Sequence, residues 1–206
     1  MRNPALEYRS VSLSDVAVDM EKRTIVGKAI PFESFSSEMR GTDGVRFKEI
    51  IKPDAIMNSL AKNDIVAFKE HNPEMILGRA SAGTLRMEKR SDGLYVAIDV
   101  PNTTYGNDLL VSAERKDIGG FSFGFGNAKG TRSVGKDGVS TMTINDMDLR
   151  EVSVTSMPAY PSTNLSLRSE GFIDETPIVE APAVADLYDK EYESIRHERL
   201  LKGFSV

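Results

Sequence analysis

The chain has 206 residues, of which 40% are hydrophobic and 28% charged, a composition typical of a soluble globular protein with a real core. No run approaches the roughly 18 apolar residues of a membrane span. The N-terminus has no apolar signal segment, so neither a membrane partner nor export by the usual route is expected. The chain has no cysteine and only two histidines, His71 and His197, which excludes disulfides, thiolate catalysis and histidine-rich metal centres. No cofactor or metal is expected.

The net charge of −5 is concentrated at the C-terminal end. Residues 170–206 contain nine acidic and four basic residues, so residues 1–169 balance to zero. Nucleic-acid binding requires clustered positive charge. The neutral body therefore argues against a nucleic-acid partner.

Residues 1–169 are predicted to be rich in strands, because β-branched and apolar residues alternate or form short runs between turn signals. The predicted strands are 6–13, 23–30, 64–71, 83–89, 93–100, 121–125, 140–146 and 149–157. An Asp-Gly pair before residue 94 is typical of a hairpin turn. The glycine-rich stretch 128–138 is expected to be a loop.

Two helices are predicted among these strands. Residues 53–63 begin with Pro53, a residue favoured at the first helical position, and residues 104–117 carry Leu109, Leu110 and Ala113 at helical spacing. Short strands with two embedded helices predict a β-rich α+β fold. Its expected core is a mostly antiparallel β-barrel, closed or nearly closed, with helices on its flanks.

The composition changes after the predicted domain of residues 1–169. Residues 170–183 contain prolines and acids and are predicted to be a flexible linker. Residues 184–206 place apolar side chains roughly on one helical face, which predicts an amphipathic helical tail. This tail is either a packed terminal helix or a detachable arm that binds a partner.

Three side chains could together perform acyl-transfer chemistry: His71, Ser122 and Glu151. A serine hydroxyl is a poor nucleophile until a neighbouring imidazole removes its proton, and the imidazole needs an acceptor at its second nitrogen. Taken singly, Ser122 can be a small strand residue, His71 a satisfied histidine and Glu151 an outward-facing strand position. Their places on three different strands would allow a rigid sheet to bring them together.

The surroundings of Ser122 have two interpretations. Gly119, Gly120 and Gly124 would let a substrate backbone approach closely, or they mark a bulge or a barrel corner. The phenylalanines at 121, 123 and 125 either pack in the core or line a substrate groove.

An ordered set of segments resembles the prohead proteases of tailed bacteriophages, which are serine peptidases distantly related to the herpesvirus protease assemblin. The segments are GKAIPFES (27–34), FKEIIKPDAIMNSL (47–60), FKEHNPEMILGRASAGTLRM (68–87), GLYVAIDVP (93–101), GGFSFGF (119–125) and LREVSVTSMPAYPST (149–163). They cover residues 23–165 in continuous order. The resemblance implies an assemblin-like barrel and a serine endopeptidase.

Carried over by motif, the resemblance assigns the catalytic base to His71 and the nucleophile to Ser122. Assemblin has a second histidine on the strand after the serine; the corresponding strand here has none, so Glu151 is expected as the third member, with Asp148 in reserve. His197 lies outside the matched region. By analogy, the oxyanion-hole donors are expected in residues 156–160.

The resemblance also implies the partners and the place of action. The expected substrates are the major capsid protein, or its scaffolding segment, and the protease itself, inside the assembling procapsid in the host cytoplasm. The tail from about residue 170 is then expected to dock the protease and to be removed by self-cleavage, and a homo-oligomer is possible. The alternative is a non-catalytic structural or scaffolding subunit on the same barrel, with Ser122 merely packed.

Overall fold

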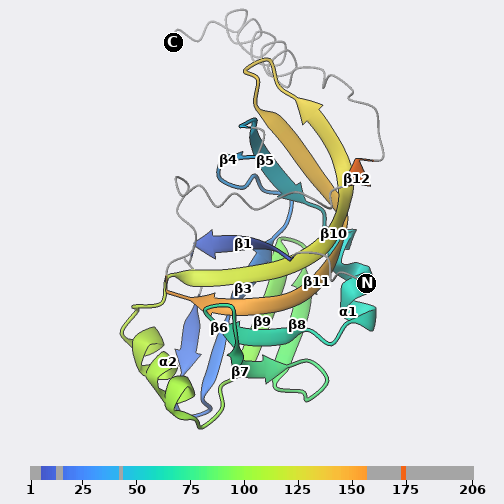
Figure 1. Ribbon diagram of the computed structural model, residues 1–206. Coiled ribbons are helices and arrows are strands. Elements are labelled where there is room, and N and C mark those ends of the chain that lie inside the picture. Colours follow the sequence, from blue (N-terminus) through green and yellow to red (C-terminus); the bar gives the residue numbers. More distant parts are fainter. Residues whose placement is uncertain (1–5, 13–15, 42–43, 157–172, 175–206) are drawn as a thin grey trace, which may run out of the picture.

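The computed structural model describes residues 6–12, 16–41, 44–156 and 173–174, and its strands form two sheets (Figure 1). The eight-stranded sheet contains β1 (Glu7–Ser12), β4 (Met39–Arg40), β5 (Arg46–Ile51), β6 (Val66–Lys69), β7 (Asn72–Arg79), β10 (Gly120–Val134), β11 (Ser140–Thr155) and β12 (Ile173–Asp174). The four-stranded sheet contains β2 (Ala17–Asp19), β3 (Thr24–Pro31), β8 (Leu85–Arg90) and β9 (Gly93–Asp99).

The two predicted helices are confirmed. A 3-10 turn, η1 (Pro53–Ile56), runs into α1 (Met57–Lys62), and α2 spans Thr104–Glu114. Leu109, Leu110 and Ala113 of α2 are buried as their spacing predicts. The hydroxyl of Thr103 caps α2 by accepting a hydrogen bond from the Gly106 amide.

The predicted closed barrel is wrong, although the β-rich class is right. The order β1–β10–β11–β5–β4 ends at two separate edges, and no ladder among the described residues joins the two sheets. The physical reason lies in β11, which pairs in parallel with β5 at Ser140–Ile144 and with β6 at Glu151–Val154. The sheet therefore branches along one strand instead of curling round to meet itself.

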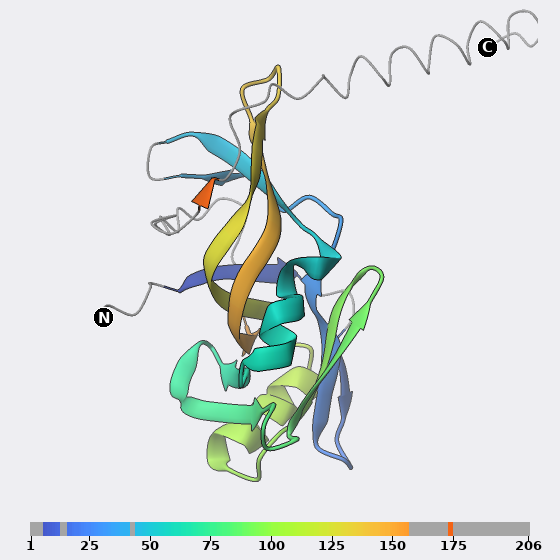
Figure 2. The same ribbon diagram turned by 90° about the vertical axis from the view of Figure 1, so that its right-hand side faces the viewer.

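The β10–β11 hairpin is much longer than expected. Residues 128–138, predicted as a loop, are mostly strand, and the predicted strands 140–146 and 149–157 are one continuous β11. The far part of this hairpin, residues 127–148, is called the arm below. The arm extends away from the four-stranded sheet, with β4 and β5 beside it (Figures 1 and 2).

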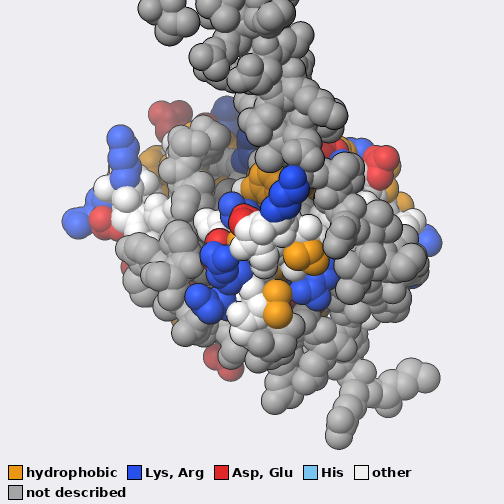
Figure 3. Space-filling model, turned by 90° about the horizontal axis from the view of Figure 1, so that it is seen from above, with side chains coloured by type: hydrophobic (Ala, Val, Ile, Leu, Met, Phe, Trp, Pro, Cys, Tyr) orange, Lys and Arg blue, Asp and Glu red, His pale blue; other side chains and the backbone are white. Residues whose placement is uncertain are grey.

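The core lies mainly away from the tip of the arm, although Ala128, Ile144 and Met147 of the arm belong to it. Seen from above, lysine and arginine side chains stand out on the described surface (Figure 3). The core instead joins apolar side chains of β3, β9, β10, β11 and α2. Its largest members with almost no exposed surface are Ile25, Ile30, Ile56, Ile65, Leu77, Leu94, Ile98, Leu109, Leu110, Phe121, Phe123 and Phe125.

The predicted linker and helical tail lie outside the described residues, apart from β12. This two-residue strand pairs in parallel with Lys129 and Gly130 of the arm.

None of the helices within the described ranges has the length and apolar character needed to cross a bilayer.

Candidate active site

The hairpin of β10 and β11 separates the core from the candidate site. Phe121, Phe123 and Phe125 point into the core and are at most 1% exposed, which confirms packing rather than a groove as their role. Side chains alternate across a strand, so Ser122 and Gly124 belong to the opposite face of β10. Ser122 lies opposite Ser153 of β11, and Gly124 lies opposite Glu151.

A bulge at Arg150 turns Glu151 onto this site face. Leu149 pairs with Phe125 and Glu151 pairs with Gly124, so Arg150 has no partner across the ladder. The extra residue lets Leu149 and Val152 both face the core while Glu151 faces the other way. Periodicity alone misses this shift, because an inserted residue reverses the alternation.

Helix α1 supports the bulge from outside. The buried Ser59 hydroxyl donates to the Met147 carbonyl (2.8 Å) and accepts from the Leu149 amide (2.9 Å). The Asn63 side-chain amide donates to the Leu149 carbonyl at 2.8 Å. The backbone before Arg150 is therefore held in place by side chains as well as by the sheet.

His71 occupies a two-residue turn between β6 and β7. Lys69 pairs with Asn72 across the turn, and both Glu70 (φ 52°) and His71 (φ 56°) are left-handed, as a type I′ turn requires. The turn is tied to the end of β11: the Glu70 amide donates to the Val154 carbonyl, and the Glu70 carboxylate accepts from the Ser156 amide at 2.7 Å.

These elements bring His71 and Glu151 together. The imidazole Nδ1 lies 2.5 Å from Glu151 Oε1, and the Ser153 hydroxyl donates to Glu151 Oε2 at 2.8 Å. Glu151 is 3% exposed. Buried polar groups need hydrogen-bond partners, and each oxygen of this carboxylate has one. With its proton on Nδ1 for this contact, His71 would present an unprotonated Nε2, the form a general base needs.

Gly124 provides the space for this pair. A Cβ built on Gly124 would lie 2.8 Å from Glu151 Cγ and 2.9 Å from Tyr8 Cε1. The space that this glycine leaves free was expected to admit a substrate backbone. It is instead filled by the side chains of Glu151 and Tyr8, next to the bulge.

Ser122 lies on the same face but is not bonded to His71. Its hydroxyl donates to the Arg9 carbonyl (2.9 Å) and accepts from the Ser10 hydroxyl (3.1 Å). The side chain is 0% exposed. The three-residue catalytic assignment therefore stays a prediction: the structure joins His71 to Glu151, and it places Ser122 one strand away, on β10.

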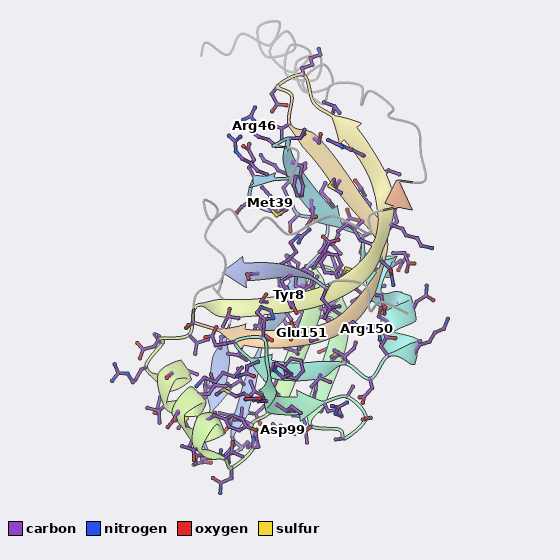
Figure 4. The ribbon with its side chains drawn as sticks, in the orientation of Figure 1. Tyr8, Met39, Arg46, Asp99, Arg150 and Glu151 are labelled. Atoms are coloured by element: carbon purple, nitrogen blue, oxygen red, sulfur yellow. The ribbon has the colours of Figure 1, made fainter. Side chains whose placement is uncertain are left out.

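The N-terminal strand β1 contributes contacts that sequence reasoning missed. The Tyr8 ring meets the His71 ring edge-on, with centroids 4.5 Å apart, and Tyr8 and Glu151 lie close together in Figure 4. Burial, reinforced by the Glu151 carboxylate, raises the pKa of the Tyr8 phenol. Residues 7–12 read from sequence only as a strand, and no local signal shows which strand they join.

The reserve residues have other partners. Asp148 accepts a hydrogen bond from Asn63 (2.7 Å) and is paired with Arg150, not with His71. The Ser156 amide, predicted as an oxyanion donor, is bonded to Glu70. Residues 157–160 and His197 lie outside the described residues.

Within the described ranges, no group of three or more histidine or acidic side chains could hold a metal ion.

In a comparison with protein families, residues 10–176 match the family described as caudovirus prohead serine protease. Comparisons with curated proteins and with solved structures found no match. The matched range contains β10, β11 and the turn that carries His71.

Proposed function

Because the chain belongs to the caudovirus prohead serine protease family, we propose that it is an endopeptidase with Ser122 as nucleophile, His71 as base and Glu151 as the group that orients His71. One observation carries the assignment: a buried carboxylate lies 2.5 Å from His71 Nδ1. An imidazole held in this way has its second nitrogen available as a base. The neighbouring strand supplies a hydroxyl on the same face of the sheet.

In the proposed first step, the Ser122 hydroxyl turns from the Arg9 carbonyl toward His71 Nε2. Nε2 takes the proton as Oγ bonds to the substrate carbonyl carbon. The tetrahedral intermediate collapses, the C–N bond breaks, and the amine leaves with the proton from His71. Water then gives a proton to His71 and its hydroxide to the acyl carbon. The bond from that carbon to Ser122 Oγ breaks, His71 returns the proton to Oγ, and the carboxylic acid leaves. Glu151 stays ionised and stabilises the imidazolium in both halves.

The proposed substrates are the scaffolding segment of the major capsid protein and this chain itself, inside the procapsid in the host cytoplasm. The family description supports a prohead setting. Self-removal of residues from about 170 onward belongs to the same proposal, and residues 170–206 carry the whole net charge of the chain. N-terminal sequencing of fragments tests this, and a tail found intact in mature particles contradicts it.

The catalytic test is co-expression with the capsid subunit, followed by mass measurement of both chains. Ser122→Ala should abolish processing, whereas Ser133→Ala, on the same strand but in the arm, should leave it unchanged. Processing that continues in the Ser122→Ala variant overturns the assignment.

A second candidate is a non-catalytic scaffolding subunit, and one observation favours it. Ser122 has no exposed surface and both its hydrogen bonds go to β1. In that case a fluorophosphonate, which reacts covalently with activated serines, should not label the chain. Labelling of Ser122 decides for the protease.

A further inference from the structure

Strand β1 contacts the proposed catalytic residues through three consecutive residues. Tyr8 packs on the His71 ring, the Arg9 carbonyl accepts from Ser122, and the Ser10 hydroxyl donates to Ser122. The register explains this grouping, because Tyr8 lies opposite Gly124 and Ser10 opposite Ser122. Both side chains therefore share the face of Ser122 and Glu151.

The alternate residues of β1 fix the strand from the core side. Arg9 makes two hydrogen bonds to Glu49 (Nε to Oε2, 2.6 Å; Nη2 to Oε1, 2.7 Å) and a third to Glu7 at 2.8 Å. Its guanidinium also lies 5.3 Å from the centre of the Phe125 ring. Burial by itself would lower the pKa of Arg9, but the charges and hydrogen bonds of Glu49 and Glu7 outweigh it and raise that pKa. Arg9 is thus a permanent cation that is hydrogen-bonded to the carboxylates of Glu7 and Glu49.

We propose that residues 8–10 of β1 are part of the catalytic apparatus, with Ser10 as the positioning residue of the nucleophile Ser122 and Tyr8 as that of the base His71. The inference rests on the proposed function. The inference goes beyond the proposed function because it assigns a role to a strand that carries none of the three proposed catalytic residues.

The chemistry of Ser10 follows from the direction of its hydrogen bond. When the Ser122 proton swings from the Arg9 carbonyl to His71, the Ser10 hydroxyl keeps donating to Ser122 Oγ. This donor holds the oxygen in place and stabilises the negative charge that grows on it. Ser10 therefore acts on the bond-forming step and not on substrate binding.

Tyr8 acts on His71 through the shape of its ring. An edge-on contact limits the rotation of the imidazole, so that Nδ1 stays on Glu151. The contact uses the ring and not the phenol hydroxyl. Tyr8→Phe should therefore preserve the site, and Tyr8→Ala should not.

The experiment measures covalent labelling of the full chain by a fluorophosphonate over a range of probe concentrations, which separates probe binding from bond formation. Ser10→Ala should slow bond formation about 5- to 30-fold, the factor for one lost hydrogen bond to a buried group, with probe binding unchanged. Ser10→Thr keeps the hydroxyl and should restore the rate. Ser12→Ala, in register with Gly120 on the same strand, is the matched control.

A second readout reports on His71 independently. The Nδ1 proton in the short bond to Glu151 should give a far-downfield proton NMR signal. The chain has only two histidines, so a signal that persists in the His197→Gln variant belongs to His71. Ser10→Ala should leave the signal in place, Tyr8→Ala should shift or broaden it, and Tyr8→Phe should not.

The outcomes separate this inference from the proposed function. If the unsubstituted chain is not labelled, or if Ser122→Ala is labelled equally well, the proposed function fails. If Ser122 is labelled but Ser10→Ala reacts at the same rate or faster, only the role of β1 fails. Equal slowing by Ser12→Ala, or no rescue by Ser10→Thr, would also overturn that role, since both point to a general loosening of the strand.

Discussion

Glu49 and Glu151 are both buried carboxylates of the eight-stranded sheet, yet they are held in different ways. Each side chain is 4% exposed. Glu49 meets a guanidinium through two hydrogen bonds, whereas Glu151 has an imidazole on one oxygen and a neutral hydroxyl on the other. A guanidinium stays protonated in proteins, whereas an imidazole can both accept and donate a proton.

Glu49 therefore faces a fixed cation, whereas Glu151 faces a side chain that can act as a base. The Arg9 side chain is 13% exposed, and its planar fork matches the carboxylate of Glu49. The His71 side chain is 27% exposed and stands in a turn at the edge of the site. The pair on the core side is suited to holding β1, and the pair on the site face is suited to chemistry.

The largest expected effect comes from Glu151→Gln, which should lower the labelling rate by about 10⁴-fold. The Gln amide would donate to His71 Nδ1 and force the proton onto Nε2, the wrong tautomer for a base. Because the side chains have the same shape, the melting temperature should change little. An unchanged labelling rate would show that Glu151 has no catalytic part.

Glu49→Ala should act on stability instead, lowering the free energy of unfolding by about 3–5 kcal/mol because it leaves Arg9 buried with half its partners. Urea denaturation measures this. Glu88→Ala removes a carboxylate from an exposed pair with Arg90 and is the control, with an expected change of less than about 1 kcal/mol. Equal effects of the two substitutions would remove the distinction between buried and surface pairs.

Ser153→Ala sharpens the comparison at Glu151. It leaves Glu151 Oε2 without its donor, at a cost of about 1–3 kcal/mol in unfolding free energy. The His71 NMR signal should shift as well, because the carboxylate loses its orientation. Ser153→Thr retains the hydroxyl and should restore both. A variant that loses stability while the signal stays fixed would make Ser153 a packing residue only.

The smallest effect concerns Glu7 and depends on pH. Burial raises the pKa of Glu7 above its ordinary value of 4.5, and the charge of Arg9 offsets this only in part. The folded protein thus binds the Glu7 proton more tightly than the unfolded chain, so this group makes folding less favourable as pH rises from 4.5 through the raised pKa.

Glu7→Gln removes that penalty. Relative to the unsubstituted chain, it should gain stability between pH 4 and pH 7, in urea denaturation at both values. A relative loss over this interval would mean that the ion pair with Arg9 dominates at neutral pH.

Local sequence patterns predicted both helices and the strands β1, β3, β6, β8, β9, β10 and β11, but they missed β2, β4, β5, β7 and β12 and did not predict the assembly. Both helices follow from Pro53 and from the spacing of Leu109, Leu110 and Ala113, and the predicted strands lie close to observed ones. The arm was misjudged because its glycines and charges resemble a loop. Its strand pairing depends on β5, which is far away in the sequence. The barrel was wrong for a related reason: branching at β11 is a property of long-range pairing.

The candidate site was predictable as far as residue types decide it. His71 and Glu151 were paired from the chemistry that an imidazole base needs, and the structure places them in contact. The bulge at Arg150 and the contacts of Tyr8 and Ser10 arise from register between distant strands. Periodicity within one segment contains no information on such register.

The turn that carries His71 has a consequence for mutagenesis. A position with φ of 56° suits few side chains, and histidine, asparagine and aspartate are among those that tolerate it. Alanine at this position would both delete the imidazole and strain the backbone, so a knock-out made that way mixes lost chemistry with a displaced loop. His71→Asn keeps the conformation and removes only the base. The backbone of the hairpin thus limits the amino acids that fit at this position, independently of what the chemistry requires.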